Sequence, residues 1–479
     1  MCMSLYINTN VAKTKHTCTM RDKFRGVLEW TNEGIPLGTQ SNEAAKLYDA
    51  TITQYVGLYD DANFNGIGGS LNKMLEADPD FIAGKALKYG LELMSTAETT
   101  RINKDLAKNV DDLVAQVSSK SDANYREKMH VQAVLNWSRG NLNQAAQAWE
   151  DVLVQYPTDM LAIKMVTDTY FFLGKQRKLR DSVARVMPLW SSADLPLKSY
   201  LHGMYAFGLV ETNFYAKAES EARKGLECEP KDGWSTHALA HVFEMEGRVD
   251  EGISHLSTTL SDWEICNLLA THNYWHWALY HIEKGEPEAA VEIFETEIRK
   301  RCHESGAMLD IVDCFSLPFR LQLENPESAE KLIGKHWSNI VELCEPHLND
   351  HILSFNDAHF MMALCGARKY AEADELLENS SSAEWISGSE VNRQLLKSIL
   401  AYSREQYELC VDLLYPIRYD LVVIGGSDAQ RDVFNQLLIA AALNSTKAEH
   451  RRLVKQLILE RAALKPVSPL TDRLSLKLN

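Results

Sequence analysis

The chain has 479 residues, a formal net charge of −16, 45% hydrophobic and 24% charged residues, and 24 Gly but only 13 Pro. Such a composition is typical of a globular protein with long regular elements, and the length requires either several compact domains or a repeat array. The acidic balance argues against nucleic acid as a partner, because affinity for phosphate backbones rests on clustered Lys and Arg.

The N-terminal segment, the cysteines and the apolar runs of the sequence bear on where in the cell the protein is found. Residues 1–21 are Thr-rich, basic and free of acidic residues, so they are expected to form a disordered tail, with a weak resemblance to a transit peptide as the alternative. One continuous helical array is expected over residues 22–479. The nine scattered cysteines contain no C-x-x-C pair and indicate buried thiols in a reducing compartment. No apolar run has the length of a membrane span, so we expect a cytoplasmic protein without membrane insertion.

The clearest internal repeats lie in residues 126–300. Residues 42–100, which precede them, have the apolar spacing of paired amphipathic helices. Ala145, Trp149 and Pro157 reproduce the second half of the tetratricopeptide pattern, and Gly140 then falls in the turn between two helices. Equivalent turn residues recur at intervals of 34, 39, 34 and 38 residues. They are Gly140, Gly174, Asn213, Gly247 and Gly285.

Other features of the sequence support the same architecture. A small residue recurs in the second helix of successive repeats, at Ala218, Gly252, Ala290 and, more loosely, Ala329 and Ala371. Residues 305–466 continue with helix-compatible apolar spacing and no convincing alternating strand. The sequence therefore predicts an all-α, tetratricopeptide-like α-solenoid superhelix of paired antiparallel helices, with loop insertions at residues 379–383 and 423–427.

Lys164 and Asp168 fall on the concave groove of their repeat, at positions 5 and 9 of its first helix. Four residues apart on a helix, they are predicted to form a solvated ion pair worth a few tenths of a kcal/mol. The alternative is that they are ligands in the groove.

The stretch HNYWHWALYH, residues 272–281, divides into two faces. Register places Tyr274, Trp277 and His281 in the core, and it turns His272 and His276 toward the groove. In the preceding repeat His237, His241 and Glu244 also fall at groove positions. First helices of neighbouring repeats lie about 8–10 Å apart, so four imidazoles and one carboxylate are predicted to share one groove.

Three functions suit this cluster. The favoured one is a non-catalytic binding module whose concave, His-rich groove or chamber holds a peptide, a protein segment or a small molecule, with no cofactor. The alternative is a divalent metal site or an enzyme, because H-x3-H projects both rings to one side of a helix and a nearby Glu could act as base. The third is a structural hydrogen-bonded network. The sequence does not decide between these or give the oligomeric state.

Further polar residues occur in the last third of the chain. Asp310 and Asp313, three residues apart, are predicted to form an exposed acidic edge, with a position in the groove as the alternative. Asn356, Asp357 and His359 stand together in SFNDAHF and are candidate groove residues.

The motif GGSDAQRDVF reads as a loop that opens a helix. Ser427 or Asp428 is expected to cap that helix, and Asp432 to favour its first turn. Arg431 is a candidate ligand-binding residue that would clamp a carboxylate or phosphate from within the superhelix.

Several long motifs resemble one family. They include SNEAAKLYDATITQYV, PTDMLAIKMVTDTYFFLG, CNLLATHNYWHWALYHIEKGE, HILSFNDAHFMMA and LLYPIRYDLVVIGGSDAQRDVFNQLLI. With them the chain resembles the tetratricopeptide repeat protein 38 family over roughly residues 25–474. The resemblance implies a tetratricopeptide-like superhelix and includes His237, His241, His272 and His276 in the family pattern. It implies no established activity, so function must be argued from the site.

Overall fold

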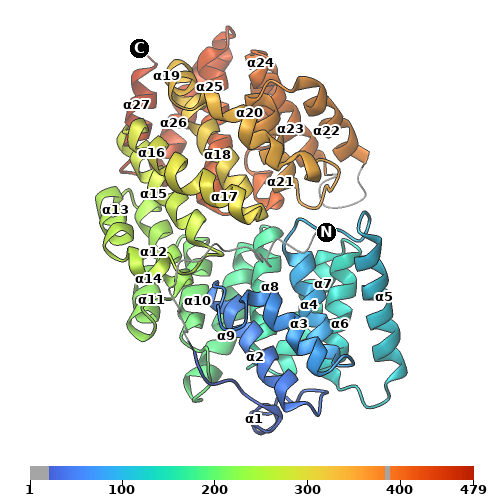
Figure 1. Ribbon diagram of the computed structural model, residues 1–479. Helices are drawn as coiled ribbons and strands as arrows, with labels where there is room; N and C mark the ends of the chain where they lie inside the picture. Colours follow the sequence, from blue (N-terminus) through green and yellow to red (C-terminus); the bar gives the residue numbers. More distant parts are fainter. Residues whose placement is uncertain (1–20, 383–388, 479) are drawn as a thin grey trace. The chain divides into compact units, whose positions relative to one another are not determined.

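A computed structural model describes residues 21–382 and 389–478 of the chain (Figure 1). Helices joined by short turns make up these residues, and no strand occurs among them, which confirms the all-α prediction. Successive helices pack against one another, as α6 does with α7 and α10 with α11. This is the paired arrangement of a tetratricopeptide-like helical repeat.

Contacts within the chain separate it into two compact units. Unit 1 comprises the residues up to Ala238 together with Leu260–Ala270, and unit 2 comprises Leu239–Thr259 and the residues from Thr271 onward. The helices of unit 1 are α1 (Val27–Asn32), α2 (Asn42–Gly57), α3 (Gly66–Ala77), α4 (Ile82–Met94), α5 (Lys104–Ser119), α6 (Tyr125–Ser138), α7 (Leu142–Gln155), α8 (Met160–Phe172), α9 (Gln176–Ser191), α10 (Tyr200–Val210), α11 (Tyr215–Cys228) and α14 (Leu260–Trp263).

Unit 2 contains both α-helices and shorter helical turns. Its α-helices are α13 (Val249–Thr258), α16 (Pro287–Ile293), α17 (Arg299–Ser305), α18 (Met308–Glu324), α19 (Pro326–Leu332), α20 (Trp337–Ile340), α21 (Ser354–Gly366), α22 (Tyr370–Ser382), α23 (Glu390–Ser403), α24 (Tyr407–Ile417), α25 (Asp428–Asn444), α26 (Ala448–Leu464) and α27 (Pro469–Leu476). Its other turns are the π-helix η1 (Phe294–Ile298) and the 3-10 helices η2 (Gly334–His336), η3 (Val341–Leu343), η4 (Glu345–His347) and η6 (Asp420–Ile424). The unit boundary passes through α12 (Gly233–Met245) and the first residue of α15 (Ala270–Lys284).

The predicted turn residues all adopt left-handed backbone conformations. The φ angles are 76° at Gly140, 62° at Gly174, 64° at Asn213, 71° at Gly247 and 82° at Gly285. Glycine enters this region without a steric penalty, and Asn tolerates it better than most residues. The repeat register derived from these five positions is therefore confirmed.

The small residues of the second helices are buried against their neighbours. Ala218 is fully buried, and a side chain at Gly252 would lie within 2.4 Å of the Tyr280 ring. Ala371 is exposed, whereas Ala373 is fully buried. The register predicted for that repeat is thus wrong by two residues, because the period is less regular after residue 300.

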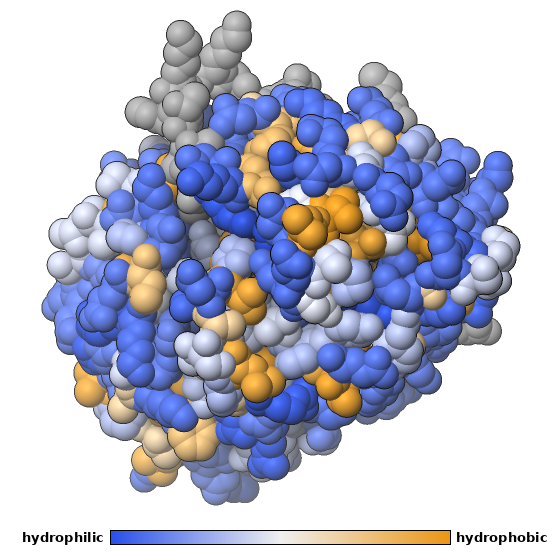
Figure 2. All heavy atoms as spheres, turned by 90° about the horizontal axis from the view of Figure 1, so that it is seen from below, coloured by the Kyte–Doolittle hydropathy of each residue, from blue (hydrophilic) through white to orange (hydrophobic). Residues whose placement is uncertain are grey.

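Two predicted irregular segments lie partly outside the described residues. The predicted tail is described only at Arg21, which pairs with Asp49 at 2.9 Å. Helix α22 extends to Ser382, so the loop predicted over residues 379–383 is wrong for residues 379–382, and Ala383 lies outside the described residues. None of the helices in the described part combines the length and the apolar character needed to cross a membrane. The face in Figure 2 is mainly hydrophilic, with hydrophobic residues gathered in small separate patches.

Candidate metal centre

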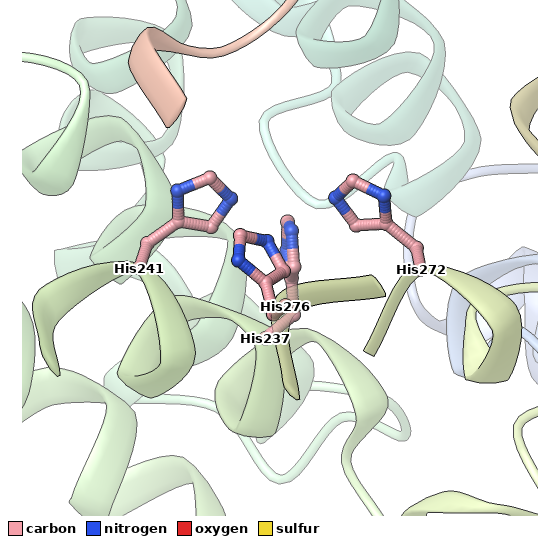
Figure 3. A group of neighbouring side chains, drawn as sticks. All are labelled: His237, His241, His272 and His276. Atoms are coloured by element: carbon pink, nitrogen blue, oxygen red, sulfur yellow. The ribbon is translucent and has the colours of Figure 1, made fainter. Parts of the chain in front are cut away.

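Four histidines meet where α12 passes α15. His237 and His241 lie one turn apart on α12, and His272 and His276 one turn apart on α15. Each offers one ring nitrogen such that the four nitrogens lie within 4.8 Å of one another. Figure 3 shows the rings of His241 and His272 pointing toward each other, with those of His237 and His276 between them. Among the described residues this is the group of His, Cys, Asp and Glu side chains that could hold a metal ion.

All four imidazoles are withdrawn from solvent. His241 and His276 are fully buried, and His237 and His272 are 3% exposed. Within unit 2, the ring centroid of His276 lies 4.3 Å from that of His241 and 4.8 Å from that of His272. The residues predicted to line a groove are therefore brought together, but in the interior and not along an open surface.

Two carboxylates orient two of these rings. Nδ1 of His276 donates to Oε2 of Glu244 at 2.9 Å, and Nδ1 of His272 donates to Oδ2 of Asp313 at 2.6 Å. A hydrogen bond from Nδ1 to a carboxylate selects one tautomer and makes the other ring nitrogen a better ligand. Both histidines thus have the arrangement common in metalloproteins, in which Nε2 binds the metal and Nδ1 binds a carboxylate.

Burial favours the neutral form of two of the four imidazoles. It lowers the pKa of His241 well below the ordinary value, and the neighbouring His276 lowers it further, while Glu244 opposes both effects. Burial also lowers the pKa of His276 well below its ordinary value, with His272 and Arg320 acting in the same direction. Metal ligands must be deprotonated, so these two imidazoles are prepared to bind a cation at neutral pH.

The spacing and donor type of the cluster fit a borderline divalent ion. Tetrahedral Zn²⁺, with Zn–N bonds of about 2.0–2.1 Å, separates its ligand nitrogens by roughly 3.3 Å. The nitrogens here lie within 4.8 Å, so shifts on the order of 1 Å would bring them to bonding distance. Four neutral nitrogen donors suit Zn²⁺, Cu²⁺, Ni²⁺ or Co²⁺, and they do not suit Mg²⁺ or Ca²⁺, which prefer oxygen.

A buried guanidinium lies next to the cluster. The Arg320 guanidinium lies 5.4 Å from the centroid of the Trp275 ring and donates to the Ala429 carbonyl at 2.7 Å. Its Nη1 lies 3.8 Å from Oδ2 of Asp432, which also pairs with Arg461. Asp432 was expected only to favour the first turn of its helix, and it instead neutralises two buried arginines.

Asp310 and Asp313 are both buried, and Asp313 contacts the cluster, which agrees with the alternative position in the groove and not with the favoured exposed edge. The predicted exposed acidic edge is wrong, because Asp310 is 2% exposed and Asp313 is fully buried. Asp310 accepts from the Ser305 hydroxyl at 2.5 Å, and burial raises its pKa to about 7. The apolar residues around both positions in MLDIVDCF were the signal that could have indicated burial.

The second set of predicted groove residues lies on α21, outside the four-histidine group. Asn356, Asp357 and His359 are all buried. Asp357 accepts from Nδ1 of His351 at 3.2 Å, and burial raises the pKa of Asp357. His359 donates from Nδ1 to the carbonyl of Phe355 at 2.7 Å. These contacts tie α21 to itself and to the segment just before it.

His359 is expected to make unit 2 sensitive to acid. Burial lowers its pKa to about 4, whereas an unfolded histidine titrates near 6.5. The unfolded chain therefore binds the additional proton first, so this contribution to stability is complete above about pH 6.5 and declines as the pH falls toward 4, by about 3 kcal/mol at most. In His359→Gln the urea-derived free energy of unfolding should decline less between pH 7 and pH 4.5. Equal declines in the variant and the unmodified chain would contradict this assignment.

Arg431 closes the loop before α25. Ser427 caps this helix, accepting from the Gln430 amide at 3.1 Å, as predicted. The Arg431 guanidinium donates to the carbonyls of Gly425 and Gly426 and pairs with Asp428 at 2.5 Å. These contacts account for the buried position of Arg431, and its role as a ligand clamp stays a prediction.

Comparisons with known proteins concern the fold alone. No family model matches the sequence. A monomeric mutant of IFIT1 with Gppp-AAAA is matched with a TM-score of 0.40 and 14% identity over 95% of this chain and 97% of the other. The human IFIT1 dimer with PPP-AAAA gives 0.41 and 12% over 95% and 97%. The APC/C hetero-tetramer Cut9–Hcn1 gives 0.34 and 10% over 92% and 97%. Tetratricopeptide-like helical repeats are what these chains have in common with this one.

The exclusion of nucleic acid as a partner is wrong. Human IFIT1 is solved with PPP-AAAA and with m7Gppp-AAAA, so chains matched to this fold are found with capped or triphosphorylated oligonucleotides. The net charge of −16 is a sum over the whole chain and does not report where Lys and Arg gather locally. An acidic total therefore cannot exclude a phosphate-bearing ligand.

Proposed function

We propose that this helical-repeat chain is a binding protein whose four-histidine cluster holds one divalent transition-metal ion. The observation that carries the proposal is the convergence of four buried ring nitrogens, two of whose rings are oriented by carboxylates. His237, His241, His272 and His276 would be the ligands. Glu244 and Asp313 would be the outer partners that fix His276 and His272 and partly balance the charge of the ion.

The donor set points to Zn²⁺ as the first candidate. Zn²⁺ accepts four imidazoles without a geometric preference of its own, and Cu²⁺, Ni²⁺ and Co²⁺ are the chemical alternatives. Once bound, such an ion supplies a Lewis acid that can polarise a carbonyl or activate water. The chain's own contribution would be to keep His241 and His276 neutral, to orient His272 and His276 through carboxylates, and to hold all four rings away from solvent.

Titration of the chelator-stripped, full-length protein with Zn²⁺ tests the proposal. We expect one equivalent to bind with a Kd below about 1 μM, and a hundredfold excess of Zn²⁺ over Kd to stabilise the fold by about 2.7 kcal/mol. Mg²⁺ should do neither. Failure of Zn²⁺, Cu²⁺, Ni²⁺ and Co²⁺ alike to bind stoichiometrically or to raise the melting temperature would exclude the metal centre.

The outer carboxylates are expected to tune this affinity. Glu244→Gln and Asp313→Asn keep the shape of each side chain and remove the charge that orients the imidazole, so each should weaken Zn²⁺ binding by about 10–100-fold. Glu286→Gln is the matched control, because Glu286 accepts from Nδ1 of His281 at 2.8 Å outside the cluster. Unchanged calorimetric affinity in both cluster variants would show that the carboxylates do not act on the metal.

We also propose membership of the tetratricopeptide repeat protein 38 family, on the long motifs quoted above. A cytoplasmic location is supported by the seven cysteines of the described residues, all free thiols and six of them buried. A peptide or small molecule as a further ligand, and an enzymatic role as the alternative, stay predictions from the sequence.

A further inference from the structure

Lys164 is a second buried functional group, and it lies in unit 1. Its side chain on α8 is 2% exposed, and its Nζ lies 2.6 Å from Oδ1 of Asp168, one turn further along the helix. The predicted solvated pair is therefore wrong, because the lysine is enclosed. The Asp168 side chain is 15% exposed, so the carboxylate end of the pair reaches the surface.

Aromatic side chains complete the surroundings of the amine. Nζ of Lys164 lies 4.6 Å from the centroid of the Tyr55 ring and 4.8 Å from that of Trp234. The Tyr55 hydroxyl donates to Oδ2 of Asp168 at 2.5 Å. The buried indole N–H of Trp234 has no hydrogen-bond partner among the described residues. The amine, a proton acceptor, a hydroxyl and an unused donor thus occupy one small region.

Burial lowers the pKa of Lys164, against the opposing effect of Asp168. A larger fraction of the side chain is therefore present as the free amine near neutral pH than for a surface lysine. Lysines in desolvated surroundings are the ones that act as nucleophiles toward carbonyl compounds.

We propose that Lys164 forms an imine with a small aldehyde or ketone. The Nζ lone pair attacks the carbonyl carbon, the C=O bond is replaced by C=N, and one water leaves. The two protons lost from Nζ go to the departing oxygen, passing through Asp168 and the Tyr55 hydroxyl. The unused N–H of Trp234 is the donor available to the carbonyl oxygen. No redox step is involved, and the site needs no metal ion.

The same residues are poorly suited to a noncovalent ionic ligand. Asp168 already neutralises the Lys164 charge, so an added carboxylate or phosphate would meet the Asp168 carboxylate as well. A cationic ligand would meet the Lys164 ammonium. An uncharged carbonyl carbon avoids both repulsions and uses the nucleophile directly.

Reductive trapping with glycolaldehyde and cyanoborohydride on the full-length protein tests this site. At limiting aldehyde and pH 7, peptide mass spectrometry should show Lys164 alkylated faster than the exposed Lys73 of α3, because burial lowers the pKa of Lys164 and leaves a larger fraction of it as free amine. The preference should shrink as the pH rises toward 10, where surface amines also lose their protons. A merely structural lysine, closed to the aldehyde, would not be alkylated faster than Lys73 at either pH.

Two variants separate the outcomes. Asp168→Asn should slow the trapping of Lys164 relative to Lys73 near pH 10, where both amines are largely unprotonated and the lost proton acceptor is the remaining difference, and Lys164→Arg should abolish the adduct while keeping a cation. Modification of Lys164 no faster than that of Lys73 in the unmodified chain would overturn the proposal, and that measurement does not depend on whether either variant folds. Zn²⁺ binding by the four-histidine cluster should be unaffected by either change.

Discussion

Replacing His241 and His276 together with alanine is expected to eliminate stoichiometric Zn²⁺ binding, lowering the affinity by at least roughly a thousandfold. Two of the four proposed ligands are removed, and Glu244 loses the imidazole that it orients. Calorimetric titration and metal analysis of the purified variant measure the first effect. The rise in melting temperature on adding Zn²⁺, seen with the unmodified chain, should disappear with it.

The variant also distinguishes a metal centre from a purely structural network. A network predicts destabilisation of the metal-free protein by about 1–3 kcal/mol and no response of the unmodified chain to Zn²⁺ or chelator. The matched control is His281→Ala, since His281 lies on the same helix and pairs with Glu286 outside the cluster. Retention of one equivalent of Zn²⁺ by the double variant, or its loss in the control, would show that the ligands have been assigned wrongly.

The fold could be predicted because its determinants are local. Turn residues at Gly140, Gly174, Asn213, Gly247 and Gly285 need a left-handed backbone, and all five have it. Their spacing gives the length of each helical hairpin without any knowledge of what packs against it. Where the period weakens, the register fails, as at Ala371, because a shift of two residues moves a side chain from the core to the surface of a helix.

The histidine cluster could be predicted only in part. Register correctly brought His237, His241, His272 and His276 together, because their positions follow from two adjacent helices. It could not show that they are buried, since solvent exposure depends on which other elements cover that face. It also does not give the pairing of Asp313 with His272, which lies 41 residues earlier in the chain, and it offers a groove position for Asp313 only as the alternative to an exposed edge.

The burial of the Lys164–Asp168 pair is not evident from the sequence for the same reason: solvent exposure depends on segments that are distant in the chain. Lys164 and Asp168 have the spacing of a surface pair, and the sequence around Lys164 does not show that Tyr55 and Trp234 cover it. Local spacing predicts which side chains meet, whereas the dielectric around them is set by distant segments. The chemical roles proposed for the histidines and for Lys164 both arise from this long-range burial.

The largest single effect on the stability of unit 1 is expected from Asp159→Asn. Asp159 caps α8 and pairs with Nε of Arg126 at 2.5 Å and Nε2 of His130 at 2.9 Å. Arg126 and Asp159 are both 1% exposed, and Arg126 also donates to the Tyr48 hydroxyl at 3.2 Å. Asn caps helices as well as Asp does and has nearly the same shape, so the substitution removes only the charge. It leaves Arg126 without its buried counter-ion, at a cost of about 3–5 kcal/mol.

Urea denaturation of the variant measures this loss, and its pH dependence identifies the cause. Burial opposes ionisation of Asp159, but Arg126 and His130 outweigh it and hold the pKa of the carboxyl far below its ordinary value. Its stabilising effect is therefore complete above about pH 4, where an unfolded aspartate ionises, and is lost as the pH falls further. The difference between the variant and the unmodified chain should shrink below pH 4. Asp181→Asn, at an exposed pair with Arg180, should change stability by less than about 0.5 kcal/mol. A similarly small effect at Asp159 would mean that the buried pair does not determine the stability of this unit.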